Sequence, residues 1–277
     1  MTILSKTEQL CKLHNITPQH SKGQNFLIEE VFYDQIITAA GITHDDLVLE
    51  VGPGLGFLTA KLAKQARKVV TVELDDKLAL LLKSTISEQK LANVSIINGN
   101  VLDIDVGQSE EDYKIVANLP YNITSVFLRK FLEQVKNKPL SMTLMLQKEV
   151  AERIVARPGA MSILAISVQY YANAEIVVEK VPAKAFWPAP KVDSAVIHIT
   201  TKNVTPDIKY TKDFFRLVKI GFSAKRKKLS HNLAAGFHIE KDEAILWMKG
   251  VGLSESLRAQ ELSLDDWRRL KKEGIYT

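Results

Sequence analysis

The residues best suited to chemistry are Asn118-Leu119-Pro120-Tyr121, a polar and aromatic turn that follows a short apolar run. The Asn118 side-chain oxygen and the Leu119 main-chain carbonyl can accept the two hydrogens of an exocyclic amine, and Pro120 fixes the turn that aims this carbonyl. Tyr121 offers a face on which a flipped base can stack. The motif suits group transfer to a weakly nucleophilic amine such as that of adenine. The alternative is an ordinary strand end with Asn and Pro as turn residues.

A second motif is the loop Glu50-Val51-Gly52-Pro53-Gly54-Leu55-Gly56, which follows an apolar run and precedes a helical pattern. Gly52 and Gly54 let a ligand approach the backbone closely, whereas Pro53 removes an N–H group that a pyrophosphate would use. The loop therefore favours a ligand without phosphates. A plain tight turn is the alternative.

Two further apolar runs end in polar residues. Glu73 lies 17 residues after Gly56, and its carboxylate can accept hydrogen bonds from both hydroxyls of a ribose. The next run ends at Asn98-Gly99-Asn100. Taken alone, Glu73 is equally well explained as a solvated carboxylate. Together the three ends suit a nucleoside cofactor without phosphates, of which S-adenosylmethionine is the common one.

The elements that must position these residues alternate between short apolar runs and helical patterns. This alternation predicts an α/β fold with a mostly parallel sheet covered on both faces, and such sheets bind ligands at the carboxyl ends of their strands. An antiparallel hairpin is expected to finish the sheet at Glu175–Val181 and Ser194–Thr200, while Ser162–Tyr171 suits a strand or a helix. The other expected strands are Leu47–Val51, Val69–Glu73, Val94–Ile97, Ile115–Ala117 and Met142–Leu146, and the expected helices between them include Phe57–Gln65 and Lys77–Glu88.

A different pattern follows Asn203–Asp207, which reads as a linker. Helices are expected over Lys212–Gly221, Lys225–Ala235, Lys241–Lys249 and Ser263–Lys272, with Thr211 and Ser263 as N-caps of the first and last. Residues 202–277 hold 16 Lys and Arg against 10 Asp and Glu, whereas residues 1–201 hold 21 against 22. The excess positive charge of the chain therefore lies in its last quarter, which suggests an acidic partner such as nucleic acid.

Composition excludes several classes of protein. The chain has 277 residues, of which 46% are hydrophobic, too many for a mainly disordered chain. The single cysteine, Cys11, excludes a disulfide framework and a multi-cysteine zinc site, and no metal is expected. No run is long enough to span a membrane, and no leader opens the chain. A cytoplasmic protein is expected.

These motifs together resemble the ribosomal RNA adenine dimethyltransferases, within the class I S-adenosylmethionine-dependent methyltransferases. The resemblance extends over nearly the whole chain. It implies a Rossmann-like, mostly parallel seven-stranded sheet and a small all-helical C-terminal domain, with residues 1–202 binding S-adenosylmethionine and residues 203–277 binding RNA. The segments that carry it are Gly23-Gln24-Asn25-Phe26-Leu27, Glu50–Gly56, Val72-Glu73-Leu74-Asp75, Asn118–Ile123, Leu146–Val150 and Pro190–Val196.

The form of Lys191–Val196 and the basic tail looks like the branch of the family that modifies small-subunit rRNA. That branch dimethylates two adjacent adenines in the 3′-terminal hairpin loop of 16S rRNA during ribosome assembly. The resemblance thus implies an immature small ribosomal subunit as partner. The chain is expected to act as a monomer without an obligate protein partner.

The resemblance also assigns roles to individual residues. In the pocket, Phe186 would face the far side of the target adenine or be a packed aromatic. For the cofactor, Asn25 and Leu27 would close over it, the loop with Gly52 and Gly54 would meet its methionine part, and Glu73 would bind its ribose. Asn118 would contact both cofactor and substrate, and Tyr121 would stack on the base.

One position departs from the family. Where the family has an acid that accepts from the cofactor's adenine amine, this chain has Asn100, whose oxygen accepts without charge. Asp103, three residues later, is the less favoured substitute. Weaker cofactor binding is expected, and Asn100→Asp is expected to tighten it.

Lys225, Arg226, Lys227 and Lys228 form the densest cationic cluster. At the start of an expected helix they oppose the macrodipole, a cost that an RNA phosphate would offset. Arg258, Arg268 and Arg269 are candidates to extend this surface. The alternative is a solvated face.

Three other functions compete with this interpretation. An adenine methyltransferase of large-subunit rRNA is the nearest, and the Lys191–Val196 segment argues against it. A non-catalytic RNA-binding assembly factor would not need an intact Asn118, Pro120 and Tyr121. A DNA adenine methyltransferase would need a target-recognition domain, for which the sequence shows no segment.

Overall fold

The computed structural model describes residues 2–19, 23–104, 111–203 and 207–274. The chain divides into two compact units. The first unit comprises Met1–Ala151 and Ala172–Thr201, and the second comprises Glu152–Tyr171 and Lys202–Thr277. This division differs from the expected boundary at residue 202 because Glu152–Tyr171 groups with the C-terminal helices.

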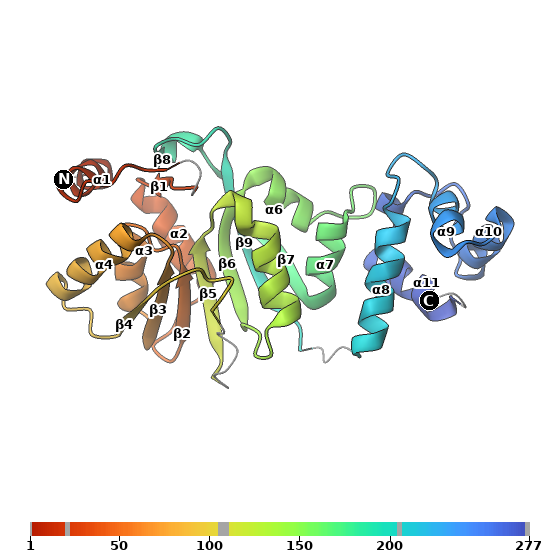
Figure 1. Ribbon diagram of the computed structural model, residues 1–277, viewed down its shortest axis with the longest axis horizontal. Helices are drawn as coiled ribbons and strands as arrows, with labels where there is room; N and C mark the ends of the chain where they lie inside the picture. Colours follow the sequence, from red (N-terminus) through yellow and green to blue (C-terminus); the bar gives the residue numbers. More distant parts are fainter. Residues whose placement is uncertain (1, 20–22, 105–110, 204–206, 275–277) are drawn as a thin grey trace. The chain divides into compact units, whose positions relative to one another are not determined.

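The first unit is built on a seven-stranded sheet with the order β4-β3-β2-β5-β6-β9-β7 (Figure 1). Neighbours from β4 to β6 pair in parallel, while β9 pairs antiparallel with both β6 and β7, so the expected hairpin is confirmed. Strand β2 has β3 on one side and β5 on the other, so the strand order reverses here. Open sheets bind ligands at such a switch point. The strands are β2 (Leu47–Val51), β3 (Lys68–Glu73), β4 (Val94–Asn98), β5 (Tyr113–Asn118), β6 (Ser141–Gln147), β7 (Ala172–Val181) and β9 (Ser194–Thr201).

Helices lie on both faces of this sheet (Figure 1). Val48, Val69 and Val116 of the strands are fully buried and pack with Ile36 and Leu62 of two helices, which explains the near-continuous apolar strands. The remaining elements are α1 (Ile3–Leu13), α2 (Glu30–Ala40), α3 (Phe57–Ala63), α4 (Asp76–Glu88), α5 (Thr124–Arg129), α6 (Lys148–Ile154), the short helices η3 (Tyr121–Ile123), η4 (Lys130–Gln134) and η5 (Ala183–Ala185), and the pair β1 (Phe26–Leu27) with β8 (Phe186–Trp187).

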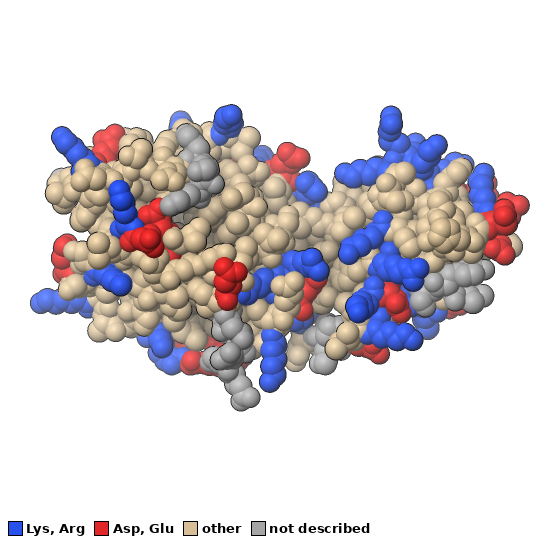
Figure 2. Space-filling view, in the orientation of Figure 1, with Lys and Arg blue, Asp and Glu red and all other residues tan. Residues whose placement is uncertain are grey.

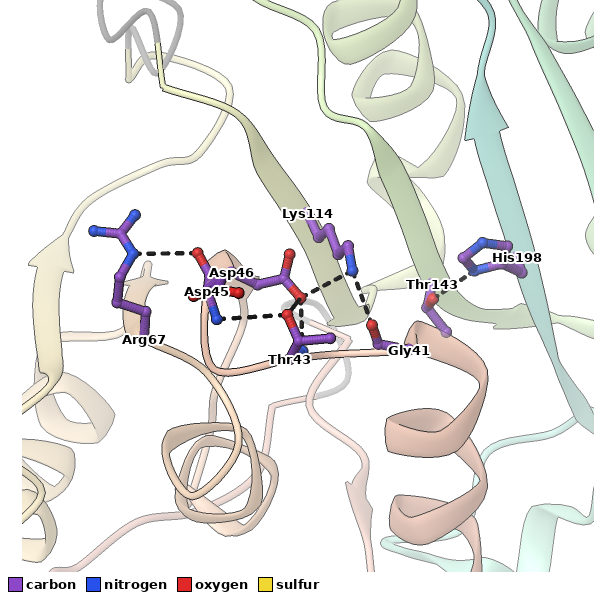
Figure 3. A network of polar contacts seen from close by, with 8 residues as sticks. All are labelled: Gly41, Thr43, Asp45, Asp46, Arg67, Lys114, Thr143 and His198. Atoms are coloured by element: carbon purple, nitrogen blue, oxygen red, sulfur yellow. Dashed lines mark hydrogen bonds and ion pairs between the residues drawn. The ribbon is translucent and has the colours of Figure 1, made fainter.

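A polar network closes the amino-terminal edge of the sheet (Figure 3). Lys114, at the start of β5, donates to the Gly41 carbonyl at 2.8 Å and to Asp46 Oδ2 at 2.9 Å. Asp46 Oδ2 also accepts from the Thr43 main-chain N–H at 2.6 Å. These bonds fasten the α2–β2 loop to β5. The opposite, carboxyl-terminal edge carries the polar residues singled out above.

The second unit is helical. Ser162–Tyr171, open between strand and helix on sequence, forms α7 (Ile163–Tyr171), and Tyr170 contacts the rings of Phe214 and Phe215 with centroids 4.9 and 5.2 Å apart. This aromatic contact explains why the segment groups with the C-terminal helices. They are α8 (Ile208–Gly221), α9 (Leu229–Phe237), α10 (Lys241–Gly250), η6 (Ala259–Glu261) and α11 (Leu264–Glu273).

The expected helix starts are partly right. Ser263 caps α11 with a capping box, as predicted. Thr211 is wrong as a cap, because α8 begins one turn earlier and the Asp207 carboxylate accepts from the Tyr210 N–H. Residues 204–206 of the expected linker lie outside the described residues. No helix in the described ranges is long and apolar enough to cross a membrane.

Candidate active site

The carboxyl ends of β2, β3 and β5 open on one cavity in the first unit. Most of the residues expected to bind the cofactor line it, although they come from five separate segments. They are Asn25, Gly52, Gly54, Glu73, Asn100 and Asn118. The switch point of the sheet therefore brings these residues together.

The loop after β2 needs its glycines. Gly52, Gly54 and Gly56 have φ values of +67°, +56° and +84°, which side chains rarely adopt. A Cβ at Gly56 would also lie 2.6 Å from Leu82 Cδ1. The loop thus turns sharply from β2 into α3 and presents bare backbone to the cavity.

Glu73, at the end of β3, joins this loop to the next turn. One carboxylate oxygen accepts from the Gly54 N–H at 3.1 Å, and the other accepts from the Asp75 N–H at 2.9 Å. Burial raises the pKa of Glu73, and these N–H groups oppose the rise by stabilising the anion. Each oxygen retains a lone pair, so Glu73 can still accept from two hydroxyls.

Glu50 is a buried carboxyl beneath the loop. Thr59 Oγ1 donates to Glu50 Oε2 at 2.7 Å, whereas Oε1 has no hydrogen-bond partner within the described part of the chain. Burial raises the pKa of Glu50 to about 8, with a smaller contribution from the charge of Glu73. Glu50 is therefore mainly protonated at pH 7.

We expect Glu50→Gln to remove a pH dependence of folding. Between pH 4.5, the ordinary pKa, and about 8, the folded protein keeps a proton that the unfolded chain releases, so stability falls as pH rises. The free energy of unfolding of the wild type should fall by a few kcal/mol across this window, at ~1.4 kcal/mol per pKa unit. That of the glutamine variant should fall much less. Urea unfolding from pH 5 to 9 measures this. Glu8→Gln, which changes an exposed carboxylate, is the control and should behave like the wild type. If the free energy of unfolding falls with pH equally in Glu50→Gln and wild type, Glu50 is not the group that keeps the proton.

Asn100 lines the cavity, and Asp103 is not among the lining residues. The two side chains are bonded to each other, because Asn100 Nδ2 donates to Asp103 Oδ2 at 2.9 Å. Asn100 Oδ1 accepts from the Leu102 N–H at 3.0 Å and keeps one lone pair. The geometry favours Asn100 as the contact to the cofactor's adenine, with Asp103 behind it.

Asn118 is oriented for accepting. Its Nδ2 donates to the Asn25 carbonyl at 3.4 Å, which leaves Oδ1 for another donor. The next residue, Leu119, donates its N–H to the Met145 carbonyl at 3.2 Å, so the turn is tied to β6. The N-terminal segment lies close against this turn, since a Cβ at Gly23 would stand 3.0 Å from Pro120 Cβ.

Tyr121 lines a second cavity, which shares Gly23, Asn25 and Asn122 with the first. Its hydroxyl is bonded to Ser194 Oγ at 2.8 Å, which holds the half-buried ring in place. The predicted stacking residue thus stands beside the cavity that holds Asn118.

Two residues that the resemblance singles out, Phe186 and Leu27, are almost fully buried. Phe186 is 3% exposed, packs in the hydrophobic core and lines neither cavity, so its alternative as a packed aromatic describes it. Leu27 pairs with Phe186 between β1 and β8 and is also buried in the core. It does not line the first cavity, but it lines a smaller one together with Gly52, Gly54 and Asn118.

Sequence reasoning missed three features of the cavity. Leu74 and Val101 line it next to Glu73 and Asn100, where they can cover the faces of a purine. Asn25 Oδ1 is buried and has no partner among the described residues, so a donor from a ligand would satisfy it. The place of Leu74, directly after Glu73, was the available signal.

The cationic cluster differs in one respect from its expectation. Lys225, Arg226, Lys227 and Lys228 precede α9 instead of opening it, with Lys228 as the N-cap. All four are exposed. Lys and Arg side chains gather over this unit, with many over α8 (Figure 2).

Comparison with known proteins points to the same chemistry as the geometry of this site. The family model for ribosomal RNA adenine dimethylase matches residues 16–274. The chain belongs to the ribosomal RNA adenine dimethylase family. A member from Dehalococcoides mccartyi strain CBDB1, named ribosomal RNA small subunit methyltransferase A, is 40% identical over 97% of this chain and 92% of the relative. A relative of the same name from Enterococcus faecalis is 39% identical over 96% and 93%.

Two solved structures are similar to this chain over most of its length. A dimethyladenosine transferase from Plasmodium falciparum has a TM-score of 0.78 at 27% identity, covering 91% of this chain and 99% of the other. The 23S rRNA methyltransferase ErmE has a TM-score of 0.73 at 26% identity, covering 90% and 99%. The Rossmann-like methyltransferase fold is thus confirmed.

As a member of this family the chain is an S-adenosylmethionine-dependent rRNA adenine methyltransferase. The cavity fits that cofactor: it combines a bare glycine loop, a carboxylate with free lone pairs, apolar Leu74 and Val101, and the orphaned oxygen of Asn25. Over the described residues no group of three His, Cys, Asp or Glu could hold a metal ion.

Proposed function

We propose that this chain dimethylates the exocyclic amines of two adjacent adenines in the 3′-terminal hairpin loop of small-subunit (16S) rRNA during assembly of that subunit. The observation that carries the proposal is the Asn118 side chain, which lines the cavity while its Nδ2 donates to the Asn25 carbonyl and leaves Oδ1 for another donor. Relatives that are about 40% identical bear the name small subunit methyltransferase and support the choice of subunit.

The residues act by binding and orienting. When bound, S-adenosylmethionine supplies a methyl group activated by its sulfonium charge. Asn118 Oδ1 and the Leu119 carbonyl accept the two amine hydrogens and thereby hold the nitrogen and enrich its lone pair. Tyr121 stacks on the base. The proton released by the methylated amine passes to water, so no general base is required.

Within this function, Asn25, Gly52, Gly54, Glu73 and Asn100 bind the cofactor. We expect Asn100→Asp to tighten S-adenosylmethionine binding, because a charged acceptor is worth about 1 kcal/mol more than a neutral one, or roughly fivefold in Kd. The new carboxylate would face Asp103, so Asn100→Asp with Asp103→Asn should gain more than the single change. Isothermal titration calorimetry measures both, with Asp103→Asn alone as control. Unchanged affinity in both variants would remove Asn100 from the cofactor site.

The two parts of the chain divide the work in this proposal. Residues 1–202 bind the cofactor and the flipped base, and residues 203–277 bind RNA through Lys225, Arg226, Lys227 and Lys228. The four exposed cations that immediately precede α9 support this role. Action as a cytoplasmic monomer on the immature subunit belongs to the same proposal.

Labelled S-adenosylmethionine and separated ribosomal subunits test the function. The expected result is label on two adjacent adenines near the 3′ end of 16S rRNA. Label only in large-subunit rRNA would overturn the choice of subunit and favour an ErmE-like activity. Binding to the small subunit without label would favour an assembly factor.

A further inference from the structure

The second cavity has a polar residue that the mechanism above does not use. This cavity has a volume of about 640 Å³, inside the range of ~300–1,000 Å³ typical of ligand pockets. Its lining includes Tyr121, Gln147 and the cation Lys191. The base-stacking residue and an uncharged amide therefore face one space beside Asn118.

Gln147 is placed by the same framework as the catalytic turn. It is the last residue of β6, and Met145, two residues earlier, is opposite Asn118 of β5 in the parallel register. On its other side Gln147 is opposite Ser194 of β9, whose hydroxyl holds the hydroxyl of Tyr121. Strand pairing thus places the backbone of Gln147 next to Ser194, the residue that holds the ring of Tyr121.

The Gln147 side chain is half-buried and enters no hydrogen bond found between the described residues. An amide that lines a cavity without an internal partner is available to a ligand, and glutamine offers both a donor and an acceptor. Within the proposed function, the ligand of this cavity is the flipped adenine.

We propose that Gln147 contacts the target adenine by donating its amide N–H to ring nitrogen N1. This inference rests on the proposed function. Each methylation replaces one hydrogen of the amine that Asn118 and Leu119 hold, so their contacts change between the first and second transfers. N1 lies beside that amine and keeps its lone pair through both. A donor from Gln147 therefore holds the base in both rounds, and being neutral it adds no positive charge of its own to a cavity that Lys191 also lines.

Gln147→Glu tests the contact, because the ionised carboxylate has nearly the same shape and cannot donate. The measurement is the single-turnover rate on reconstituted small subunits that carry adenosine or 1-deazaadenosine, which has C–H in place of N1, at the target positions. On adenosine, the single-turnover rate of the wild type should exceed that of Gln147→Glu by about 3- to 10-fold, the effect of one hydrogen bond. On 1-deazaadenosine the two rates should differ little. Gln65→Glu, an exposed residue, should match the wild type on both.

The ratio of wild-type to variant rate on each substrate distinguishes a lost contact to N1 from a general distortion of the pocket. A variant that merely distorts the pocket would lose the same factor on both substrates, and equal ratios would overturn the inference. Equal rates for wild type and variant on adenosine would do the same. If the wild type methylates neither substrate, the proposed function fails and the inference falls with it.

Discussion

Replacing Asn118 by alanine is expected to lower the rate of methyl transfer by at least about 100-fold. The Asn118 oxygen is one of two acceptors that hold the amine, and removing one such preorganised group from an active site costs roughly 10²–10³ in rate. Its Nδ2 bond to Asn25 shows that the acceptor is preorganised before substrate binds. Single-turnover transfer from labelled S-adenosylmethionine to small subunits measures the loss.

Two comparisons make this result specific. Asn118→Asp keeps an acceptor at the same place and should retain more activity than Asn118→Ala. Asn173→Ala, an exposed asparagine of β7, is the matched control and should leave the rate unchanged. Because Asn118 also lines the cofactor cavity, calorimetry must show that cofactor affinity changes far less than the rate. A rate within threefold of wild type for Asn118→Ala would contradict the proposed role.

The sequence predicted the parallel strands well because each is a short apolar run bounded by residues that stop it. Leu47–Val51 has the expected bounds, since Gly52 follows with a positive φ. Ser162–Tyr171 remained open because a buried helix can be apolar on every side and then resembles a buried strand. Its assignment to the second unit depends on Phe214 and Phe215, more than 40 residues away in sequence.

The candidate site was predictable wherever a polar residue ends an apolar run, as Glu73 and Asn118 do, because parallel strands end at one edge. Contacts between side chains of different strands were not predictable from the sequence. Gln147 also ends a strand, but its closeness to Tyr121 depends on the pairing of β6 with β9. Which side of the β1–β8 pair is packed was also not readable from the sequence, so the burial of Phe186 and Leu27 came from the structure alone.

Neutralising Lys225, Arg226, Lys227 and Lys228 together to glutamine is expected to weaken RNA binding and flatten its salt dependence. Each phosphate contact contributes about 0.7–0.9 to the slope of log K against log salt concentration, so four contacts contribute about three. Affinity for the small subunit near 0.1 M salt should fall more than about tenfold on the same basis. Filter binding across a salt series measures both quantities.

A control variant must remove as much charge without touching this cluster. Lys12, Lys64, Lys83 and Lys90 are exposed residues of the first unit, and their joint change to glutamine should leave the slope nearly unaltered. A solvated cluster would give the same small change in both variants and would remove the RNA-binding assignment.

Helix α8 of the same unit carries a second cationic surface that could bind the RNA instead. The cations at positions 209, 212, 216 and 219 of α8 are exposed and recur every three or four residues, so they share one face of the helix. Removing these four is expected to change the slope less, because the four cations of the Lys225–Lys228 cluster are consecutive and therefore denser. If the α8 variant alone flattens the slope, the RNA lies along α8 and the assignment moves there.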